Sequence, residues 1–240
     1  MSDARVVLLI GSAPDALRSA DWPRSVATTI VAINNAWRIR PDWDYLVAPD
    51  DFPADRHPPA PAPGQRVIGS DDYVPANNRF GGVFYCGGTM AFSAGYWALD
   101  ALRPTVLAYV GCDMIYAPGG QTHFYGTGTA DPLRDDPSLR SLEAKSARLM
   151  LLAARQGCAC VRLSSGDSRL VFPAADHRAL AAVPPPAGGA GDLVEAALAE
   201  ERRLGYVCPS GRYWEVASGF LVAAVDALDA MWLKAARPGT

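Results

Sequence analysis

The residues best suited to chemistry lie in an aromatic, glycine-rich loop over residues 116–126. His123 stands between Tyr116 and Tyr125 in this loop, and the chain contains only three histidines. Histidine takes up or releases a proton near neutral pH and so serves as a general base or acid, while tyrosine hydroxyls can hydrogen-bond a departing phosphate. The residues predict either a catalytic or ligand-binding loop built on His123, Tyr116 and Tyr125, or an aromatic loop that packs on the domain.

Small and polar residues follow four apolar runs of the sequence, at the point where each run ends. The runs are typical of buried strands, and the carboxyl ends of parallel strands share one edge of an open sheet. Ligands bind to such sheets at that edge, in the crevice where the strand order reverses. We therefore expect one site built from the residues after these runs, which are Gly11, Ser12, Ala13, Asn34, Asn35, Asp50, Asp51, Gly111, Cys112 and Asp113.

Two segments of the chain are candidates for binding an anion. Gly11-Ser12-Ala13-Pro14 joins the first apolar run to a helix start, and Gly87-Gly88-Thr89 precedes a second helix. Glycine lets a ligand approach the backbone, and the N–H groups at a helix start attract phosphate. Each segment also fits a tight packing turn. The first one lacks the lysine of a P-loop and does not fit G-x-G-x-x-G, which disfavours an ordinary P-loop nucleotidase or a standard dinucleotide dehydrogenase.

The asparagines and aspartates in the expected site have two interpretations each. Asn34 and Asn35 can offer amide groups to a base, a ribose or a sugar hydroxyl, or one of them can cap the following helix. Asp50, Asp51 and Asp113 can bind a divalent cation if the sheet brings them together, or they can be solvated loop residues. We assign no metal site from the sequence.

Strands and helices alternate along the first two thirds of the chain. Continuous apolar or β-branched runs predict strands, a proline-rich stretch over residues 52–64 predicts an irregular excursion, and a polar loop is expected between residue 69 and Gly87. Helices are expected over residues 90–102 and 142–156. The pattern predicts an α/β fold with a doubly wound, mostly parallel, Rossmann-like sheet, with strands over residues 6–10, 29–33, 44–48, 67–69, 105–110 and 158–163.

The C-terminal quarter of the chain predicts a helical appendage. We expect a nucleotide- or nucleotide-sugar-binding domain over residues 1–183, a proline- and glycine-rich linker over 184–191 and a helical segment over 192–240. The helices of that segment are expected over residues 193–204 and 214–233. They could serve as a lid, a docking arm or an element of a homo-oligomer.

Composition excludes several classes of function. The 240 residues carry a formal net charge of -3 with no block of Lys or Arg, so nothing points to nucleic-acid binding. No apolar run reaches the roughly 18–20 residues of a membrane span, and the N-terminus lacks the features of a secretory signal. We therefore expect a cytoplasmic protein. Its five cysteines lack the spacing of a zinc site and are expected to be small buried side chains.

The order of these motifs resembles the bacterial sialyltransferase-like and DUF115-like group of Rossmann-type proteins. The likeness covers about residues 5–173, and the order of its short motifs is more specific than any one of them. They are Gly11-Ser12-Ala13-Pro14-Asp15, Ile33-Asn34-Asn35, the Pro-Asp-Trp-Asp-Tyr-Leu-Val-Ala-Pro-Asp segment over residues 41–50, Cys86-Gly87-Gly88-Thr89-Met90-Ala91, and Gly111-Cys112-Asp113-Met114-Ile115-Tyr116.

The resemblance implies transfer of a sugar from a nucleotide-activated donor to a glycan or other hydroxyl acceptor, without an obligatory metal. The donor would be a CMP-linked acidic sugar of the sialic-acid type. By analogy Asn34 or Asn35 and the Gly11 loop would hold the nucleotide, and Tyr116 and Tyr125 would stabilise the departing phosphate. In the sialyltransferases the catalytic histidine stands just before the helix expected here at residue 142. This chain has Asp135-Asp136-Pro137-Ser138 in that area, so either His123 takes the role or the reaction differs.

Three hypotheses follow from the sequence. In the first, a glycosyltransferase uses His123 to deprotonate an acceptor hydroxyl that attacks the anomeric carbon. In the second, a diphosphokinase of the DUF115-like pterin type uses Asp50 and Asp113 with magnesium to position ATP. In the third, a binding or assembly protein retains a nucleotide pocket without catalysis.

Overall fold

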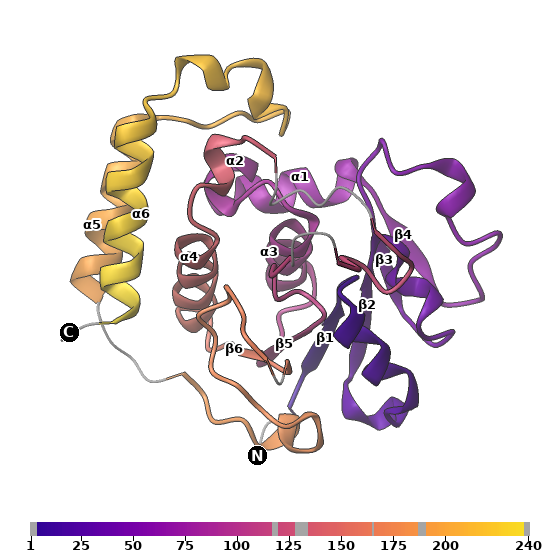
Figure 1. Cartoon of the computed structure of the whole chain (residues 1–240). Coiled ribbons are helices and arrows are strands. Elements are labelled where there is room, and N and C mark those ends of the chain that lie inside the picture. Colours follow the sequence, from indigo (N-terminus) through magenta and orange to yellow (C-terminus); the bar gives the residue numbers. More distant parts are fainter. Residues whose placement is uncertain (1–3, 117–119, 128–133, 165, 187–190, 238–240) are drawn as a thin grey trace.

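The sheet has the predicted architecture. The computed structural model describes residues 4–116, 120–127, 134–164, 166–186 and 191–237. In this part of the chain six strands form one parallel sheet in the order β4-β3-β2-β1-β5-β6 (Figure 1). An α/β, Rossmann-like fold is thereby confirmed. The strands are β1 (Val6–Ile10), β2 (Thr29–Ile33), β3 (Tyr45–Val47), β4 (Arg66–Ile68), β5 (Val106–Val110) and β6 (Ala159–Arg162).

Strand order reverses at β1. The chain adds β2, β3 and β4 in turn on one side of β1 and then crosses to the other side to form β5. Leu8 in β1 is paired with Ile30 of β2 and with Ala108 of β5, and all three side chains are buried. Burial on both faces explains why these strands are continuous apolar runs. The reversal places a crevice above the carboxyl ends of β1 and β5, where ligands bind in sheets of this kind.

Helices cover one face of the sheet. These are α1 (Ser70–Asn78), α2 (Val83–Cys86), α3 (Met90–Ala101) and α4 (Leu142–Ala154). The predictions for α3 and α4 agree with the structure to within two residues. The prediction of a polar loop between residue 69 and Gly87 is wrong, because this stretch of the chain forms α1 and α2. Pro75 inside α1 and the polar residues at its start conceal a helix that buries Tyr73 and Ala76 against the core.

The opposite face is covered by short 3-10 helices and irregular segments. The 3-10 helices Pro14–Asp21, Asn34–Arg38 and His177–Ala182 lie on this side, and Trp22 and Trp43 fill the space beneath them. A connection of this kind brings the chain from β1 to β2 without a long helix. The carboxyl ends of both strands therefore lead directly into short turns.

The C-terminal helices belong to the same core as the sheet. Helices α5 (Gly191–Leu204) and α6 (Val222–Ala236) form a hairpin that packs on α4 (Figure 1, orange and yellow). Two buried ion pairs join the hairpin to α4: Arg148 Nε lies 2.7 Å from Glu201 Oε1, and Lys145 Nζ lies 3.0 Å from Asp229 Oδ1. Removing one partner of a buried pair leaves an uncompensated charge, so these pairs fix the hairpin firmly.

The second helix of this region starts later than predicted. Helix α6 begins at Val222 rather than at residue 214, and residues 205–221 form an irregular segment with two short 3-10 turns. Gly205 and Gly211, which lie between the end of α5 and the expected start of the second helix, adopt positive φ. Of the expected linker over 184–191, residues 187–190 lie outside the described residues.

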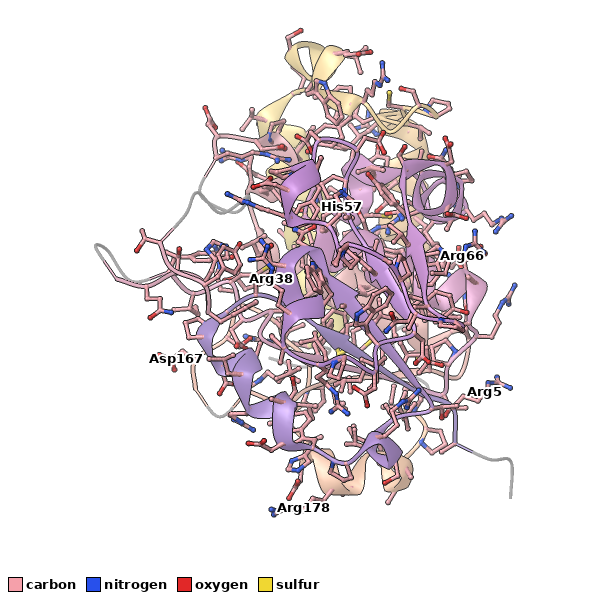
Figure 2. All side chains as sticks on the ribbon, turned by 90° about the vertical axis from the view of Figure 1, so that its right-hand side faces the viewer. Arg5, Arg38, His57, Arg66, Asp167 and Arg178 are labelled. Atoms are coloured by element: carbon pink, nitrogen blue, oxygen red, sulfur yellow. The ribbon has the colours of Figure 1, made fainter. Side chains whose placement is uncertain are left out.

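Residues 205–221 lie over the carboxyl edge of the sheet. Arg5, which directly precedes β1, and Arg178 lie in the lower half of Figure 2, whereas residues 205–221 lie at the upper end.

None of the helices within the described ranges is long and apolar enough to cross a bilayer. Burial is confirmed for four of the cysteines, and it raises the pKa of the Cys158 thiol to about 12.

Candidate functional site

Two adjacent pockets lie along the carboxyl edge of the sheet. The first, called the β1 pocket here, has a volume of about 300 Å³ and sits above the ends of β1, β2 and β5. The second, called the Trp214 pocket, has a volume of about 740 Å³. It lies between the ends of β3 and β4 and the irregular segment over residues 205–221, which is called the C-terminal segment here. Both volumes suit a small-molecule site. The pockets share four wall residues, which are Pro49, Asp51, Thr89 and Met90.

The β1 pocket collects most of the residues predicted from the sequence. Segments that are more than 100 residues apart along the chain meet in its wall, because the parallel sheet places their strand ends at one edge. The predicted residues in the wall are Gly11, Ser12, Ala13, Asn34, Asn35, Asp51, Thr89, Gly111, Cys112, Tyr116, His123 and Tyr125. The expected convergence on the crevice at the strand reversal is therefore a property of the fold.

The two glycines at the bottom of this pocket serve close packing. A Cβ on Gly11 would lie 2.3 Å from the Gly111 carbonyl oxygen, and a Cβ on Gly111 would lie 2.4 Å from the Ala16 Cβ. The Gly11 N–H donates to the Val110 carbonyl, and the Ala13 N–H donates to the Gly111 carbonyl. Two of the amides expected to cradle an anion are thus engaged with β5. The Gly11 loop is a packing turn, and the 3-10 helix after it begins with a proline, which has no N–H.

Asn34 and Asn35 offer unmet hydrogen-bonding capacity to the β1 pocket. Asn35 is only 2% exposed, and Asn34 has a φ of 53°, a conformation that asparagine tolerates better than most residues. Neither side chain caps the 3-10 helix that they begin. The Oδ1 atoms of both are buried and, within the described ranges, accept no hydrogen bond. A buried acceptor without a partner costs about 1–3 kcal/mol, so a ligand donor that reached either oxygen would relieve this cost.

The loop that carries His123 is held against the end of β1. Its turn is closed by two hydrogen bonds between His123 and Gly126, and the Phe124 N–H donates to the Ser12 carbonyl at 2.9 Å. The His123 ring stacks on Tyr125 with centroids 4.9 Å apart, and Thr122 Oγ1 lies 2.8 Å from His123 Nδ1. The imidazole is therefore oriented by its neighbours. Residues 117–119 of the predicted loop lie outside the described residues.

The start of α3 lies at the boundary between the two pockets. The Thr89 hydroxyl caps the helix by accepting a hydrogen bond from the Phe92 N–H at 3.4 Å, and Met90 lines both pockets. The positive end of the helix dipole thus faces the place where the pockets meet. Gly87, which has positive φ, lines neither pocket, because its position is packed against Phe92 and Lys145.

The structure separates Asp50 from Asp113. Asp50 lines the Trp214 pocket and accepts a hydrogen bond from Ser70 Oγ at 2.7 Å. Asp113 lines neither pocket; burial raises the pKa of its carboxyl, which is hydrogen-bonded to Ser164 and Ser168. Three strand spacings separate β3 from β5, or roughly 14 Å. Among the described residues no group of three or more His, Cys, Asp or Glu side chains is arranged to hold a metal ion.

A hydrogen-bonded network joins the C-terminal segment to the start of α3. Tyr213 is 1% exposed, and its hydroxyl donates to Asp136 Oδ2 at 2.6 Å. The same hydroxyl accepts hydrogen bonds of 3.0 Å from Ser138 Oγ and Arg134 Nη2. Ser138 and Arg134 in turn bind the N–H and carbonyl of Gly88. Burial and the bond to Asp136 raise the pKa of Tyr213 to about 12.

Sequence reasoning missed several residues of the two pockets. Arg56, in the proline-rich excursion, is an exposed cation in the wall of the β1 pocket. Trp214 stands at the expected start of the second C-terminal helix, and Arg212 lies in the stretch just before it. No local signal marks these positions, because their roles depend on how the excursion and the C-terminal segment fold back over the sheet.

The chain was compared with protein-family models, with curated proteins and with solved structures, and none of the three comparisons finds a match.

Proposed function

We propose that the protein is a glycosyltransferase whose β1 pocket binds the nucleotide part of a nucleotide-activated sugar. The observation that carries this proposal is the pair of buried amide oxygens of Asn34 and Asn35, which have no protein partner in the described residues. Both residues line a pocket of about 300 Å³ at the reversal of strand order. Amide groups hydrogen-bond to the edge of a base and to ribose hydroxyls. The motif resemblance favours a CMP-linked donor.

The phosphate of the donor fits best at the start of α3. The N–H groups of Met90 and Ala91 belong to the first turn of this helix, where backbone donors and the helix dipole favour an anion. Arg56 supplies a positive charge to the same pocket, and Tyr116 and Tyr125, each with a hydroxyl donor, are in its wall. These donors would stabilise the negative charge that develops on the phosphate as it leaves.

The proposed reaction is a substitution at the anomeric carbon of the donor sugar. The acceptor hydroxyl oxygen forms a bond to that carbon, and the bond between the carbon and the phosphate oxygen breaks. The electron pair of the broken bond stays on the nucleotide phosphate. The hydroxyl proton passes to the imidazole of His123, which is in the wall of the same pocket as the donor.

Turnover of activated sugars tests the proposal directly. The full-length chain is incubated with CMP-, UDP- and GDP-linked sugars, with and without magnesium, and released nucleotide is measured by chromatography. We expect one class of donor to be consumed slowly by transfer to water when no acceptor is present. Magnesium-dependent consumption of ATP, with every nucleotide sugar left intact, would favour the diphosphokinase instead. Binding without turnover of any compound would favour a non-catalytic nucleotide-binding protein.

A further inference from the structure

We propose that the Trp214 pocket is the acceptor site and that it takes a saccharide without acidic groups. Its role as an acceptor site rests on the proposed function, whereas its ability to bind a saccharide does not. The pocket shares Asp51, Thr89 and Met90 with the β1 pocket. A hydroxyl of a ligand in the Trp214 pocket can therefore reach a sugar carried by a nucleotide in the β1 pocket. The start of α3, where we place the phosphate, lies at this junction.

One wall of the pocket is an exposed aromatic surface. Trp214 is 63% exposed, and its ring packs edge-on against Tyr213 with centroids 5.6 Å apart. Tyr213 is itself held by hydrogen bonds to Asp136, Ser138 and Arg134. The indole of Trp214 therefore packs against a side chain that is itself held in place. A flat exposed indole offers apolar area and a π face at little entropic cost, and this suits the C–H face of a sugar ring.

Carboxylates are the other marked feature of the pocket wall. Asp50, Asp51 and Asp71 line the pocket from the ends of β3 and β4 and the start of α1. Burial raises the pKa of Tyr73 to about 12, and the charges of Asp50 and Asp51 contribute to that rise, so the two carboxylates act on the same region. Carboxylates accept hydrogen bonds from vicinal hydroxyl groups. An aromatic face and several acceptors in one pocket are suited to a polyhydroxylated ring.

Charge decides between acidic and other saccharides. The cations in the wall already have acidic partners: Arg134 Nη2 lies 2.8 Å from Asp136 Oδ2, and Arg212 Nη1 lies 3.9 Å from Glu215 Oε1. Asp50, Asp51 and Asp71 therefore dominate the local field. A carboxylate or phosphate on a ligand beside Asp50 and Asp71 would be repelled. Neutral and amino saccharides are the class that remains.

This assignment gives the C-terminal region a specific task. Residues 209–214 supply one side of the pocket. Their position depends on the Tyr213 network and on the hairpin of α5 and α6, which the buried ion pairs fix to α4. The region that lies outside the resembling part of the chain therefore selects the acceptor, while the sheet binds the donor.

Binding of saccharides to the intact protein tests the inference independently of catalysis. The purified chain is applied to an array of neutral, amino and acidic saccharides, and the best probe is then titrated in solution. Trp214→Ala should weaken binding by about 5- to 10-fold. Val216→Ala is the matched control, because Val216 is 50% exposed on the same segment and lines neither pocket. We expect Val216→Ala to bind like the wild type and to hydrolyse the donor at the wild-type rate.

The outcomes separate this inference from the proposed function. Selective binding of neutral or amino saccharides that is lost in Trp214→Ala supports the inference, even if no nucleotide sugar is consumed. Failure of every saccharide to bind, preference for acidic ones, or binding insensitive to Trp214→Ala overturns it, even if a donor is hydrolysed. Asp71→Asn gives a second check at an exposed position, and a gain in binding of acidic saccharides is the expected result.

Discussion

The backbone N–H of Phe124 donates a hydrogen bond of 2.9 Å to the carbonyl oxygen of Ser12. This single contact joins a loop after β5 to the turn after β1, and it places His123 in the wall of the same pocket as the two asparagines after β2. Backbone contacts of this kind do not depend on the side chains that they position. Substituting His123 therefore changes the chemistry of the pocket without removing the bond that holds the loop.

His123→Ala should abolish most transfer and leave nucleotide binding intact. Loss of a general base typically lowers the rate by about 10²- to 10⁴-fold, because the acceptor hydroxyl must then lose its proton to water. His177→Ala is the control, since His177 stacks on Trp22 on the far face of the sheet. The rate of product formation and the affinity for the nucleotide are measured on the same preparations. Wild-type turnover in His123→Ala would remove this residue from the mechanism.

Gly111→Ala should destabilise the fold more than Gly157→Ala does. Both glycines have positive φ, at 67° and 74°, so both substitutions carry the strain of that conformation. A Cβ at Gly111 would also meet the Ala16 Cβ at 2.4 Å, whereas nothing lies within 4 Å at Gly157. We expect the packing clash to add about 1–3 kcal/mol. Urea denaturation of the two variants measures the difference. Equal losses in the free energy of unfolding would show that the turns after β1 and β5 adjust to the added Cβ at little cost in stability.

The network around Tyr213 should make the protein sensitive to acid. Burial tends to raise the pKa of Asp136, but hydrogen bonds from Tyr213, Ser138 and Arg134 outweigh it and hold that pKa below its ordinary value. A carboxyl whose pKa is lowered in the folded state contributes stability above its unfolded pKa and loses it as the pH falls through the folded pKa. Stability measured from pH 6 down to pH 2 should therefore fall less steeply in Asp136→Asn than in the wild type. Identical slopes would contradict this account.

Glu201→Gln should destabilise the C-terminal hairpin severely. Glu201 accepts hydrogen bonds from Arg148 and from Trp232 Nε1, and breaking a buried pair typically costs about 3–5 kcal/mol. Glu195→Gln is the matched control, because the pair of Glu195 with Arg155 is about half exposed and should contribute less than about 1 kcal/mol. Thermal unfolding of the three proteins checks the contrast, and comparable effects of the two substitutions would show that burial is not what strengthens the pair.

Much of the fold followed from local patterns in the sequence. The apolar runs of β1 and β2 predicted both strands to the residue, because central parallel strands are apolar on both faces. The positions after the strands predicted part of the wall of the β1 pocket, because the carboxyl ends of parallel strands share one edge of the sheet. Helix α1 was missed because it carries Pro75 and an acidic first turn, and the start of α6 was misplaced because aromatic and apolar residues continue before it.

The remaining part of the site depends on contacts between distant segments. Nothing in the local sequence indicates that Tyr213 meets Asp136 or that Trp214 lines one pocket with Asp51 and Asp71. The Gly11 loop was ambiguous between an anion cradle and a packing turn, and only the position of Gly111 decides for the turn. Local patterns thus predict elements and strand ends, whereas the second pocket is a consequence of tertiary packing.

Asn35→Ala provides the most direct test of the central claim that the β1 pocket binds a nucleotide. The variant and the wild type are titrated calorimetrically with CMP, CDP, UDP, GDP and ATP, and their unfolding is measured without ligand. Because Asn35 Oδ1 is buried and accepts no hydrogen bond among the described residues, its loss should leave the stability of the free protein unchanged or slightly higher. Asn77→Ala is the control that should lose stability, since Asn77 Nδ2 donates to the Tyr73 and Ser93 carbonyls.

Our account predicts that one nucleotide, CMP first among them, binds the wild type and that Asn35→Ala weakens this binding at least about 10-fold, by the loss of roughly 1.4 kcal/mol. The variant should meanwhile unfold no more readily than the wild type. Failure of all five nucleotides to bind the wild type, or binding that is equally tight in Asn35→Ala, would contradict the account.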